Sequence, residues 1–324
     1  MKAWLVEAIS DPPQMRLADV PMPEASADHY LVKVEATGLN FLDTLVVKGK
    51  YQAKPALPFS PGVEVVGSIV APADGPLPVG TRVAGALPSG RFGGFAEYAL
   101  VSKADAVALE ASIPAGAALA MRGNYPTSLY SLREAGRLAP GETLLVHAGA
   151  GGVGSAAIQI GKVMGARVIA TAGSPDKLQR CREMGADEVV DYSTPAWVDA
   201  VRQLAPKGVD VVYDPVGGEF GINSLRCLAF GARYLVIGFA SGGLTALPAN
   251  RLLLANASAI GVLWGEVRRR DPALSARLTE EIFAWYREGK FAELPVSSFP
   301  FEQAPAAVAA LETRKTVGKV VLTF

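Results

Sequence analysis

The stretch Leu144-Leu-Val-His-Ala-Gly149-Ala-Gly151-Gly-Val-Gly154 decides the fold of this 324-residue chain. A short apolar run leads into a G-x-G-x-x-G spacing, and we expect a helix over residues 153–164 directly after it. In such a turn the first glycine permits a tight bend, the second lets backbone approach a pyrophosphate, and the third lets the helix pack closely on its strand. The helix N-terminus adds free N–H groups and a positive dipole. The stretch predicts a dinucleotide-binding turn, with Gly152 and Val153 as further cofactor contacts.

The spacing of apolar runs divides the chain into two kinds of segment. Up to about residue 120, short strand-like runs are separated by proline and glycine, which is typical of an antiparallel barrel or sandwich; they cover residues 30–36, 63–70, 81–86 and 95–101. Farther on, strands alternate with helices, which indicates right-handed βαβ units and a parallel sheet; these strands cover residues 143–147, 167–172, 188–191, 209–214 and 233–239. The fold class is α/β.

The C-terminal third combines a helix with a returning strand. Asp271 followed by Pro272 reads as an N-cap and first-turn proline, and the helix should end before Gly289. The tail, residues 316–324, is strand-like, and we interpret it as returning to the first domain. The predicted domains are therefore a substrate domain of residues 1–120 with 265–324, and a nucleotide-binding domain of residues 121–264. A substrate cleft is expected between them.

Composition excludes several classes of function. The 31 basic residues balance 31 acidic ones, so no global field attracts nucleic acid or an anionic membrane. No stretch approaches the roughly 20 apolar residues that span a bilayer, and the N-terminus shows no export signal. Only Cys181 and Cys227 occur, each in an expected helix, which excludes a disulfide framework and a cysteine-rich zinc site. We expect a cytoplasmic protein whose substrate is a small molecule.

The turn after the second parallel strand indicates which nucleotide binds. An NAD-preferring turn carries an Asp or Glu about 20 residues beyond the glycines, and this chain has Gly173-Ser174-Pro-Asp-Lys177 there. The Ser174 hydroxyl and the Lys177 ammonium can receive a 2′-phosphate, so NADPH is favoured. Equally, Ser174 is an ordinary N-cap and Lys177 a solvated helix residue, and the two roles are compatible. Asp176 lies within the helix turn and is interpreted as a dipole partner.

Several blocks in a fixed order resemble a known family. With the glycine turn, they are Ala36-Thr-Gly-Leu-Asn40-Phe-Leu-Asp43, Pro61-Gly-Val-Glu64-Val-Val-Gly67, Gly93-Gly-Phe-Ala-Glu97-Tyr, Gly185-Ala-Asp-Glu-Val-Val-Asp-Tyr192 and Val209-Asp-Val-Val-Tyr-Asp214-Pro-Val-Gly217-Gly. Over essentially its whole length the chain resembles the zinc-independent, zeta-crystallin-like quinone oxidoreductases of the medium-chain dehydrogenase/reductase superfamily. The resemblance implies a GroES-like antiparallel β-barrel domain, a doubly wound Rossmann domain with a six-stranded core, NADPH, and a homodimer joined through the Rossmann edge, here residues 257–264.

The residues at the zinc positions of related enzymes differ in this chain. Zinc-dependent relatives have a cysteine where Asn40 stands and a histidine where Val63 stands. Zinc catalysis needs three N, S or O ligands and an open position, which these two residues do not supply. The only histidines, His29 and His147, are interpreted as core or surface residues. We predict that no metal is bound.

The resemblance also assigns roles to individual residues. It places Asn40 beside nicotinamide and substrate, with Asp43 supporting its loop and Tyr51 lining the cleft. A turn-forming asparagine and a structural carboxylate are the alternative interpretations of the first two. Arg122, Tyr125 and Thr127 fall at the domain crossover, where Thr127 is the favoured contact with nicotinamide.

Tyr125 either donates a hydrogen bond to a reduced carbonyl or merely packs. For the cofactor, the resemblance implies further contacts at Tyr192, Ile237, Gly238, Phe239 and Lys319, although Lys319 has surface charge as its alternative.

Three functions remain open from the sequence. The first is an NADPH-dependent reductase of quinones or α,β-unsaturated carbonyl compounds, which needs a positioned hydride donor and a group that stabilises oxyanion charge. The second is an enoyl-CoA or acrylate-type reductase, because Met121-Arg-Gly-Asn-Tyr-Pro-Thr127 resembles segments of such relatives. Arg91 either guides an anionic substrate or is a solvated loop residue. The third is a non-catalytic NADPH-binding or structural protein, since fold alone does not fix function.

Overall fold

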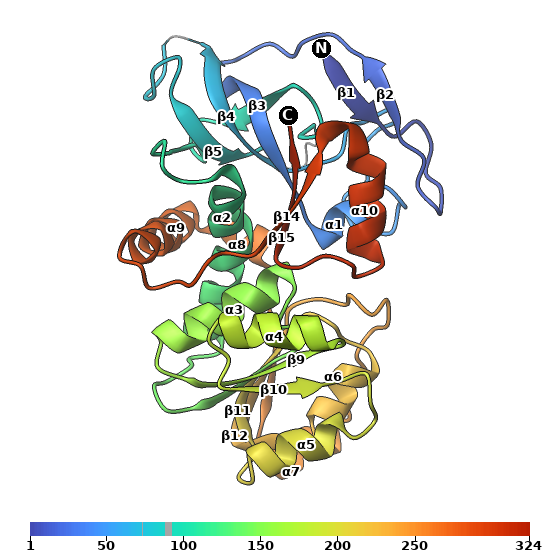
Figure 1. Cartoon of the computed structure of the whole chain (residues 1–324), viewed down its shortest axis with the longest axis vertical. Coiled ribbons are helices and arrows are strands. Elements are labelled where there is room, and N and C mark those ends of the chain that lie inside the picture. Colours follow the sequence, from blue (N-terminus) through green and yellow to red (C-terminus); the bar gives the residue numbers. More distant parts are fainter. Residues whose placement is uncertain (73, 88–92) are drawn as a thin grey trace. The chain divides into compact units, whose positions relative to one another are not determined.

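The structure is a computed structural model that describes residues 1–72, 74–87 and 93–324. The chain forms two compact units, shown in Figure 1. Unit 1 comprises Met1–Gly123 and Pro295–Phe324, and unit 2 comprises Asn124–Leu294. Arg91, considered above as a guide for anionic substrates, lies outside the described residues.

Unit 1 is built on a mainly antiparallel seven-stranded sheet with the order β14-β15-β3-β4-β5-β7, in which β6 also pairs with β3. A separate pair of strands is formed by β1 and β2. The strands are β1 (Lys2–Leu5), β2 (Arg16–Asp19), β3 (His29–Leu39), β4 (Glu64–Ala71), β5 (Arg82–Ala86), β6 (Tyr98–Ser102), β7 (Val107–Ala108), β14 (Val296–Pro300) and β15 (Lys319–Thr323). Each strand-like run predicted in this region corresponds to a strand.

The C-terminal tail returns to unit 1, as the sequence predicts. Strand β15 pairs antiparallel with β3, where Val320 is opposite Leu39, and parallel with β14. Two helices, α1 (Phe41–Val46) and α10 (Ala304–Glu312), pack on this part of the sheet, next to the 3-10 turn Phe301–Gln303. Residues from both ends of the chain therefore share one apolar core.

Unit 2 contains the predicted parallel sheet, with six strands in the order β10-β9-β8-β11-β12-β13. The strands are β8 (Thr143–Val146), β9 (Arg167–Ala172), β10 (Glu188–Asp191), β11 (Val209–Asp214), β12 (Leu228–Val236) and β13 (Ser258–Gly261). Strand β12 begins at Leu228 rather than at residue 233, because Gly231 interrupts the apolar run and the sequence pattern therefore did not indicate the first half of the strand. It ends at Val236, three residues before the predicted end.

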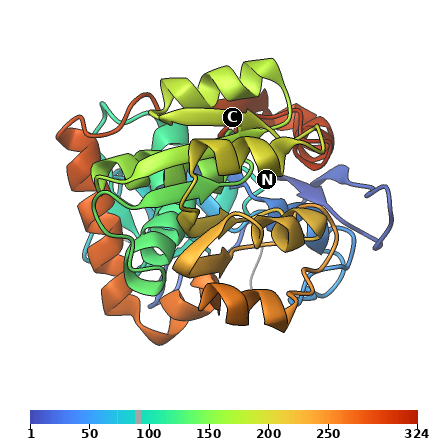
Figure 2. The same cartoon turned by 90° about the horizontal axis from the view of Figure 1, so that it is seen from below.

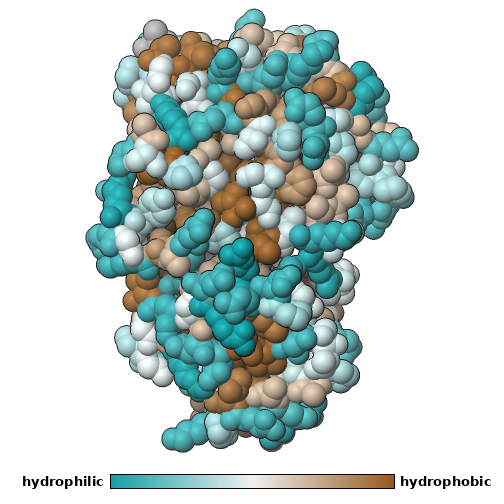
Figure 3. Space-filling model, viewed as in Figure 1, coloured by the Kyte–Doolittle hydropathy of each residue, from teal (hydrophilic) through white to brown (hydrophobic). Residues whose placement is uncertain are grey.

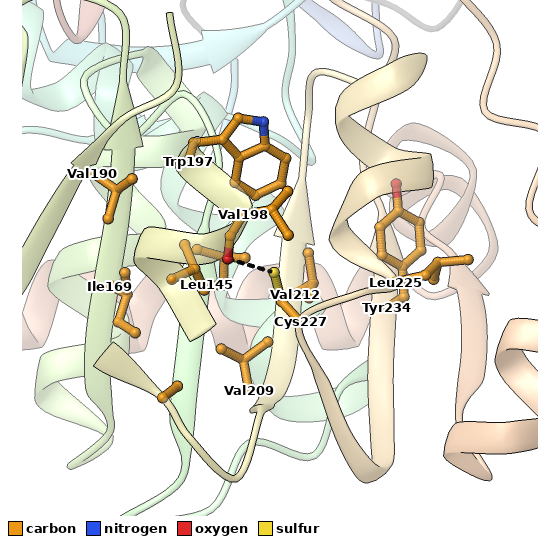
Figure 4. Close-up of a cluster of buried hydrophobic side chains, with 12 residues drawn as sticks. Leu145, Ile169, Val190, Trp197, Val198, Val209, Val212, Leu225, Cys227 and Tyr234 are labelled. Atoms are coloured by element: carbon orange, nitrogen blue, oxygen red, sulfur yellow. Dashed lines mark hydrogen bonds between the residues drawn. The ribbon is translucent and has the colours of Figure 1, made fainter. Parts of the chain in front are cut away.

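Helices flank this sheet on both faces, as Figure 2 shows, and complete a doubly wound fold. They are α3 (Gly152–Val163), α4 (Pro175–Glu183), α5 (Trp197–Leu204), α6 (Glu219–Ser224) and α7 (Ala249–Ala255). In the core drawn in Figure 4, Trp197 and Val198 of α5 pack over side chains of β8, β9, β10 and β11. Cys227 donates its thiol to the Val198 carbonyl at 3.8 Å, and it lies just before β12 rather than in a helix, because α6 already ends at Ser224.

The boundary between the units differs from the predicted one at residues 264 and 265. Besides the parallel sheet, unit 2 includes α2 (Ala115–Leu129) from residue 124 onward, α8 (Trp264–Arg270) and α9 (Pro272–Arg287). Two interactions hold α9 and its C-terminal extension there: the Arg133 guanidinium donates to Glu281 at 2.7 and 2.8 Å, and Tyr125 packs edge-on against Phe291. Asp271 caps α9 as predicted, accepting from the Leu274 N–H.

The surface drawn in Figure 3 mixes hydrophilic residues with small groups of apolar ones. Over the described ranges of the chain, no helix is both long enough and apolar enough to cross a membrane.

Candidate functional site

The glycine turn of unit 2 joins the end of β8 to the start of α3. Ala148 takes a left-handed conformation with φ of 50°, and Gly151 caps the helix in an extended conformation. The Gly149 N–H donates to the Thr171 carbonyl at 2.8 Å, and the Gly151 N–H donates to the Ala148 carbonyl at 2.9 Å. The first turn of α3 therefore begins at the carboxyl edge of the sheet, with its N-terminal dipole directed to that edge.

The three glycines of the turn differ in what an added Cβ would contact. A Cβ on Gly154 would overlap the Ala148 carbonyl oxygen, and a Cβ on Gly149 would lie 2.8 Å from Cys181 Sγ, so the turn itself requires both glycines. A Cβ on Gly151 meets only the Ala148 oxygen, at 3.2 Å, which a small shift relieves. Because Gly151 has no side chain, the space on the outer side of the turn is clear, and this is the side on which the motif approaches a pyrophosphate. The residues present therefore fit a dinucleotide.

Next to the turn, Asn124 packs its amide against the backbone of Gly152, where a Cβ would come within 3.0 to 3.2 Å of it. The Asn124 side-chain oxygen is buried and has no protein partner among the described residues. The Val153 carbonyl accepts a hydrogen bond from Ser128 Oγ at 3.0 Å. Sequence reasoning did not single out Asn124, because asparagine within a helix gives no distinctive signal.

Buried polar side chains lie at the ends of the strands beside the turn. The two ring nitrogens of His147 lie 2.9 Å from Thr171 Oγ1 and 2.7 Å from Ser224 Oγ. Burial lowers the pKa of His147, which favours the neutral imidazole. Asp214 accepts from the backbone N–H groups of Val216 and Gly217 and from the Tyr234 hydroxyl. These partners support the interpretation of His147 as a core residue.

The turn after β9 contains the predicted N-cap. Ser174 Oγ accepts from the Lys177 N–H at 3.4 Å, and Pro175 follows as the first helical residue. The last residue of β9 is Ala172, so no carboxylate stands at this strand end. Tyr192 flanks the turn, since a Cβ on Gly173 would lie 3.1 Å from its ring. Capping the helix occupies one acceptor site of the Ser174 hydroxyl. The hydroxyl proton is not used by the cap, so the predicted contact of Ser174 with the 2′-phosphate is compatible with it.

The segment after β12 leaves the same edge of the sheet. The Ile237 N–H donates to the Asp214 carbonyl at 2.9 Å, and the Gly238 N–H lies 3.4 Å from the same oxygen. Phe239 is 40% exposed. Strands β8, β9, β11 and β12 are parallel, so their carboxyl ends lie at one edge of the sheet. Three predicted cofactor segments follow these ends: the glycine turn, residues 173–177 and residues 237–239. Open α/β sheets bind ligands at this edge.

Unit 1 contains a buried cluster around Asn40. The Lys319 ammonium donates to Asn40 Oδ1 at 2.8 Å and forms a close ion pair with Glu64. Asn40 Nδ2 donates to Glu64 Oε1 at 2.9 Å. The Lys319 and Glu64 side chains are 1% and 7% exposed, so Lys319 is neither a surface charge nor, within unit 1, an open cation for a cofactor. Sequence reasoning gave Glu64 no role, although a lone carboxylate opening an apolar strand was the available signal.

The Asp43 carboxylate binds backbone N–H groups next to this cluster. It accepts from the Asn40 N–H at 2.8 Å and from the Gly62 N–H at 3.2 Å. Burial raises the pKa of Asp43 from 3.8 to about 7, against the opposing effect of these donors and of Lys319. Half-buried Tyr51 follows α1, and burial together with Asp43 raises the pKa of its phenol.

The predicted crossover residues have separate environments. Arg122 is buried and donates to the carbonyl and carboxylate of Asp105, at 3.0 and 2.6 Å, so its guanidinium is engaged within unit 1. Tyr125 is buried against Phe291, its hydroxyl has no protein partner in the described ranges, and burial raises its pKa. The Thr127 carbonyl accepts from Ser131 Oγ at 2.6 Å. The roles of Tyr125 and Thr127 stay predictions.

Comparison with known proteins agrees with the architecture. Residues 26–111 match the family model of the alcohol dehydrogenase GroES-like domain, and residues 152–280 match the model described as zinc-binding dehydrogenase. The GroES-like sheet and the parallel sheet with its glycine turn define a medium-chain dehydrogenase/reductase. The predicted fold class is confirmed.

Individual relatives narrow this class. The chain is 36% identical to quinone oxidoreductase-like protein 2 of Bos taurus over 297 residues, 90% of this chain and 84% of the relative. It is 31% identical to the synaptic vesicle membrane protein VAT-1 homolog of Rattus norvegicus over 333 residues, 95% and 80% of the two chains. The quinone oxidoreductase of Thermus thermophilus, solved also with NADPH, matches with a TM-score of 0.84 and 33% identity over 100% of both chains. The chain belongs to the quinone oxidoreductase-like family and is an oxidoreductase.

The raised pKa of Asp43 predicts a pH-dependent stability. Between about pH 4 and pH 7 the folded protein retains a proton that the unfolded chain has released, so this residue lowers the free energy of unfolding as pH rises. Urea unfolding of the wild type and Asp43→Asn at pH 5 and pH 8 measures the effect. We expect the variant to lose less stability than the wild type over this interval, and an equal loss in both proteins would contradict the assignment.

Proposed function

We propose that this oxidoreductase transfers a hydride from NADPH to a quinone or an α,β-unsaturated carbonyl compound. The observation that carries the proposal is the glycine turn, whose second glycine leaves its outer side clear for a pyrophosphate. NADPH is the cofactor because the end of β9 lacks a carboxylate and because the Thermus relative forms a complex with NADPH. When bound, the nicotinamide supplies the hydride.

The cofactor contacts in this proposal lie mainly in unit 2. The glycine turn, Gly149 to Gly154, would hold the pyrophosphate, and Ser174, Lys177 and Tyr192 would contact the 2′-phosphate. The backbone of residues 237–239 would bind the nicotinamide carboxamide. Lys319 is not retained as a cofactor contact because its ammonium is engaged by Asn40 and Glu64.

Unit 1 supplies the group that stabilises charge on the substrate. After its bond to Glu64, the Asn40 amide has a second side-chain N–H with no partner among the described residues, and it can donate that N–H to the substrate oxygen. No metal is required in this scheme. Among the described residues, no group of three or more His, Cys, Asp and Glu side chains could hold one. The family resemblance also implies that Asn40 and Val63 stand where zinc-dependent relatives have ligands.

We also propose a homodimer formed through the edge of the parallel sheet. Strand β13 is the last strand of the sheet, so among the described residues no strand pairs with the outer side of its backbone. Large apolar side chains near it are strongly exposed: Phe230 80%, Leu253 79%, Leu254 75% and Leu263 61%. Such a patch beside an open edge is typical of a protein interface. A cytoplasmic location, expected from the sequence, completes the proposal.

The first prediction of this proposal concerns nucleotide preference. The protein should bind NADPH more tightly than NADH, because a carboxylate that would repel the 2′-phosphate is absent. Lys177→Ala should narrow the difference, while Lys207→Ala, a lysine distant in sequence from the proposed contacts, should leave it unchanged. Fluorescence titration with both nucleotides measures this, and equal or tighter NADH binding by the wild type would refute the assignment of residues 173–177.

The second prediction concerns turnover with a panel of quinones, enones and enoyl-CoA esters, each assayed with and without a chelator. Asn40→Ala should lower kcat by about a hundredfold for the poorer enone acceptors, and less for quinones, with NADPH affinity unchanged. Tyr125→Phe and Thr127→Val test the other two candidate donors in the same way.

The panel also separates the alternatives. Preference for acyl-CoA enoates would favour the enoyl-thioester reductase, and tight NADPH binding without any turnover would favour a non-catalytic protein. Wild-type turnover in all three variants, or activity that a chelator abolishes, would contradict the proposed chemistry.

The third prediction concerns the dimer. Leu254→Asp places a charge in the exposed apolar patch, so it should convert a dimer to a monomer without changing the far-ultraviolet circular dichroism. Sedimentation velocity measures the change, with Glu288→Ala, at the exposed C-terminal end of α9, as a control that should remain dimeric. A monomeric wild type at micromolar concentration would rule the dimer out.

A further inference from the structure

We propose that Glu64 and Lys319 are positioning residues that fix the orientation of the Asn40 side-chain amide, so that it presents an N–H donor to the substrate. This inference rests on the proposed function, in which Asn40 contacts the substrate oxygen. The buried ion pair of Glu64 and Lys319 has no other role in the proposed chemistry.

The orientation of the amide follows from the chemistry of the three groups. An ammonium group only donates hydrogen bonds and an ionised carboxylate only accepts them, whereas an amide does both from atoms of similar size. Lys319 Nζ donates to Asn40 Oδ1 at 2.8 Å, and Asn40 Nδ2 donates to Glu64 Oε1 at 2.9 Å. Rotating the amide by 180° would oppose two donors at Lys319 and two acceptors at Glu64. The pair therefore permits only one orientation.

That orientation determines which hydrogen-bonding group of the Asn40 amide faces the substrate, namely an N–H donor. One of the two Nδ2 protons is bonded to Glu64, and the other has no acceptor within the part of the chain that the structure describes. The backbone of Asn40 is fixed independently, because its N–H donates to the Asp43 carboxylate at 2.8 Å. Developing negative charge on a substrate oxygen is stabilised by a donor that is already aligned before the reaction.

Burial makes the constraint strong. The Lys319 and Glu64 side chains are 1% and 7% exposed, so water cannot readily replace either partner. Backbone confines them on both sides: a Cβ on Gly38 would lie 2.6 Å from Glu64 Oε1 and 2.8 Å from Lys319 Cε, and a Cβ on Gly123 would lie 2.6 Å from Glu64 Oε2. Two glycines thus leave space for the charges.

Stability alone is a weak explanation for this arrangement. Taking two charges out of water offsets much of their attraction, and apolar replacements of buried pairs are often as stable. A buried pair that selects one orientation of a neighbouring polar group has a different purpose, namely specificity of conformation. The presence of a third polar group, Asn40, bonded to both charges matches this purpose.

A double-mutant cycle tests the inference through kcat for an enone substrate. Asn40→Ala should lower kcat by about a hundredfold and Lys319→Met by about 10- to 100-fold, with the Kd of NADPH unchanged. If Lys319 acts through Asn40, adding Lys319→Met to Asn40→Ala should change kcat by less than about twofold. Arg233→Met, which breaks the partly buried pair with Glu142 in unit 2, is the matched control and should keep wild-type kcat.

A second readout needs neither cofactor nor turnover. In protein labelled with ¹⁵N-asparagine, the side-chain signals of Asn40 are those absent from Asn40→Ala. In the wild type their exchange with water should be slow, and Lys319→Met should accelerate it and shift both proton signals, whereas Arg233→Met should not. If Lys319→Met does not fold, the neutral pair Glu64→Gln with Lys319→Met replaces it, because no unpaired charge is then buried.

The outcomes are distinct. The positioning role would be overturned if Lys319→Met lowered kcat by the same factor in the wild type and in Asn40→Ala. Unchanged Asn40 side-chain signals in the Lys319→Met protein would overturn it as well. Wild-type kcat in Asn40→Ala would instead refute the donor role in the proposed function, while the amide signals would still report whether the charge pair fixes the orientation.

Discussion

The close approach of α3 to the end of β8 is the constraint on which the rest of unit 2 depends. Gly154 lies so near the Ala148 carbonyl that a single methyl group at this position would overlap it. This packing starts the helix at the carboxyl edge of the sheet, where its first turn presents backbone N–H groups and the positive end of the helix dipole. The parallel order of the strands then brings the ends of β9 and β12 to the same edge. One backbone contact thus creates the place where a dinucleotide fits.

In unit 1 the corresponding constraint is the fixed orientation of the Asn40 side-chain amide, which is bonded to Lys319 and Glu64. Its C-terminal strand carries Lys319 into the sheet, where the ammonium meets Glu64 at the start of β4 and Asn40 just after β3. Residues far apart in sequence therefore complete one cluster. The antiparallel pairing of β15 with β3 is the structural reason that the chain's last strand belongs to the domain formed by its first residues.

The sequence predicted the elements whose signals are local. The strands 167–172, 188–191 and 209–214 follow from apolar runs, and the N-caps at Ser174 and Asp271 follow from capping residues. The tail was also predicted as a strand from its apolar run, and its interpreted return to the first domain agrees with the pairing of β15 with β3. What it did not predict depends on contacts distant in sequence. Glu281 pairs with Arg133 and keeps α9 in unit 2, and Lys319 pairs with Glu64 and is buried although lysine usually marks a surface. The roles of Tyr125 and Thr127 stay predictions.

The reaction that we propose for this chain is a direct, metal-independent transfer of a hydride from NADPH. The most direct measurement is a single turnover with an enone in excess chelator, using NADPH deuterated on either face of nicotinamide C4. If the hydride passes directly to the enone, one of the two labelled cofactors reacts more slowly and leaves its deuterium on carbon in the product. Product without deuterium from either cofactor, or loss of turnover in the chelator, would contradict it.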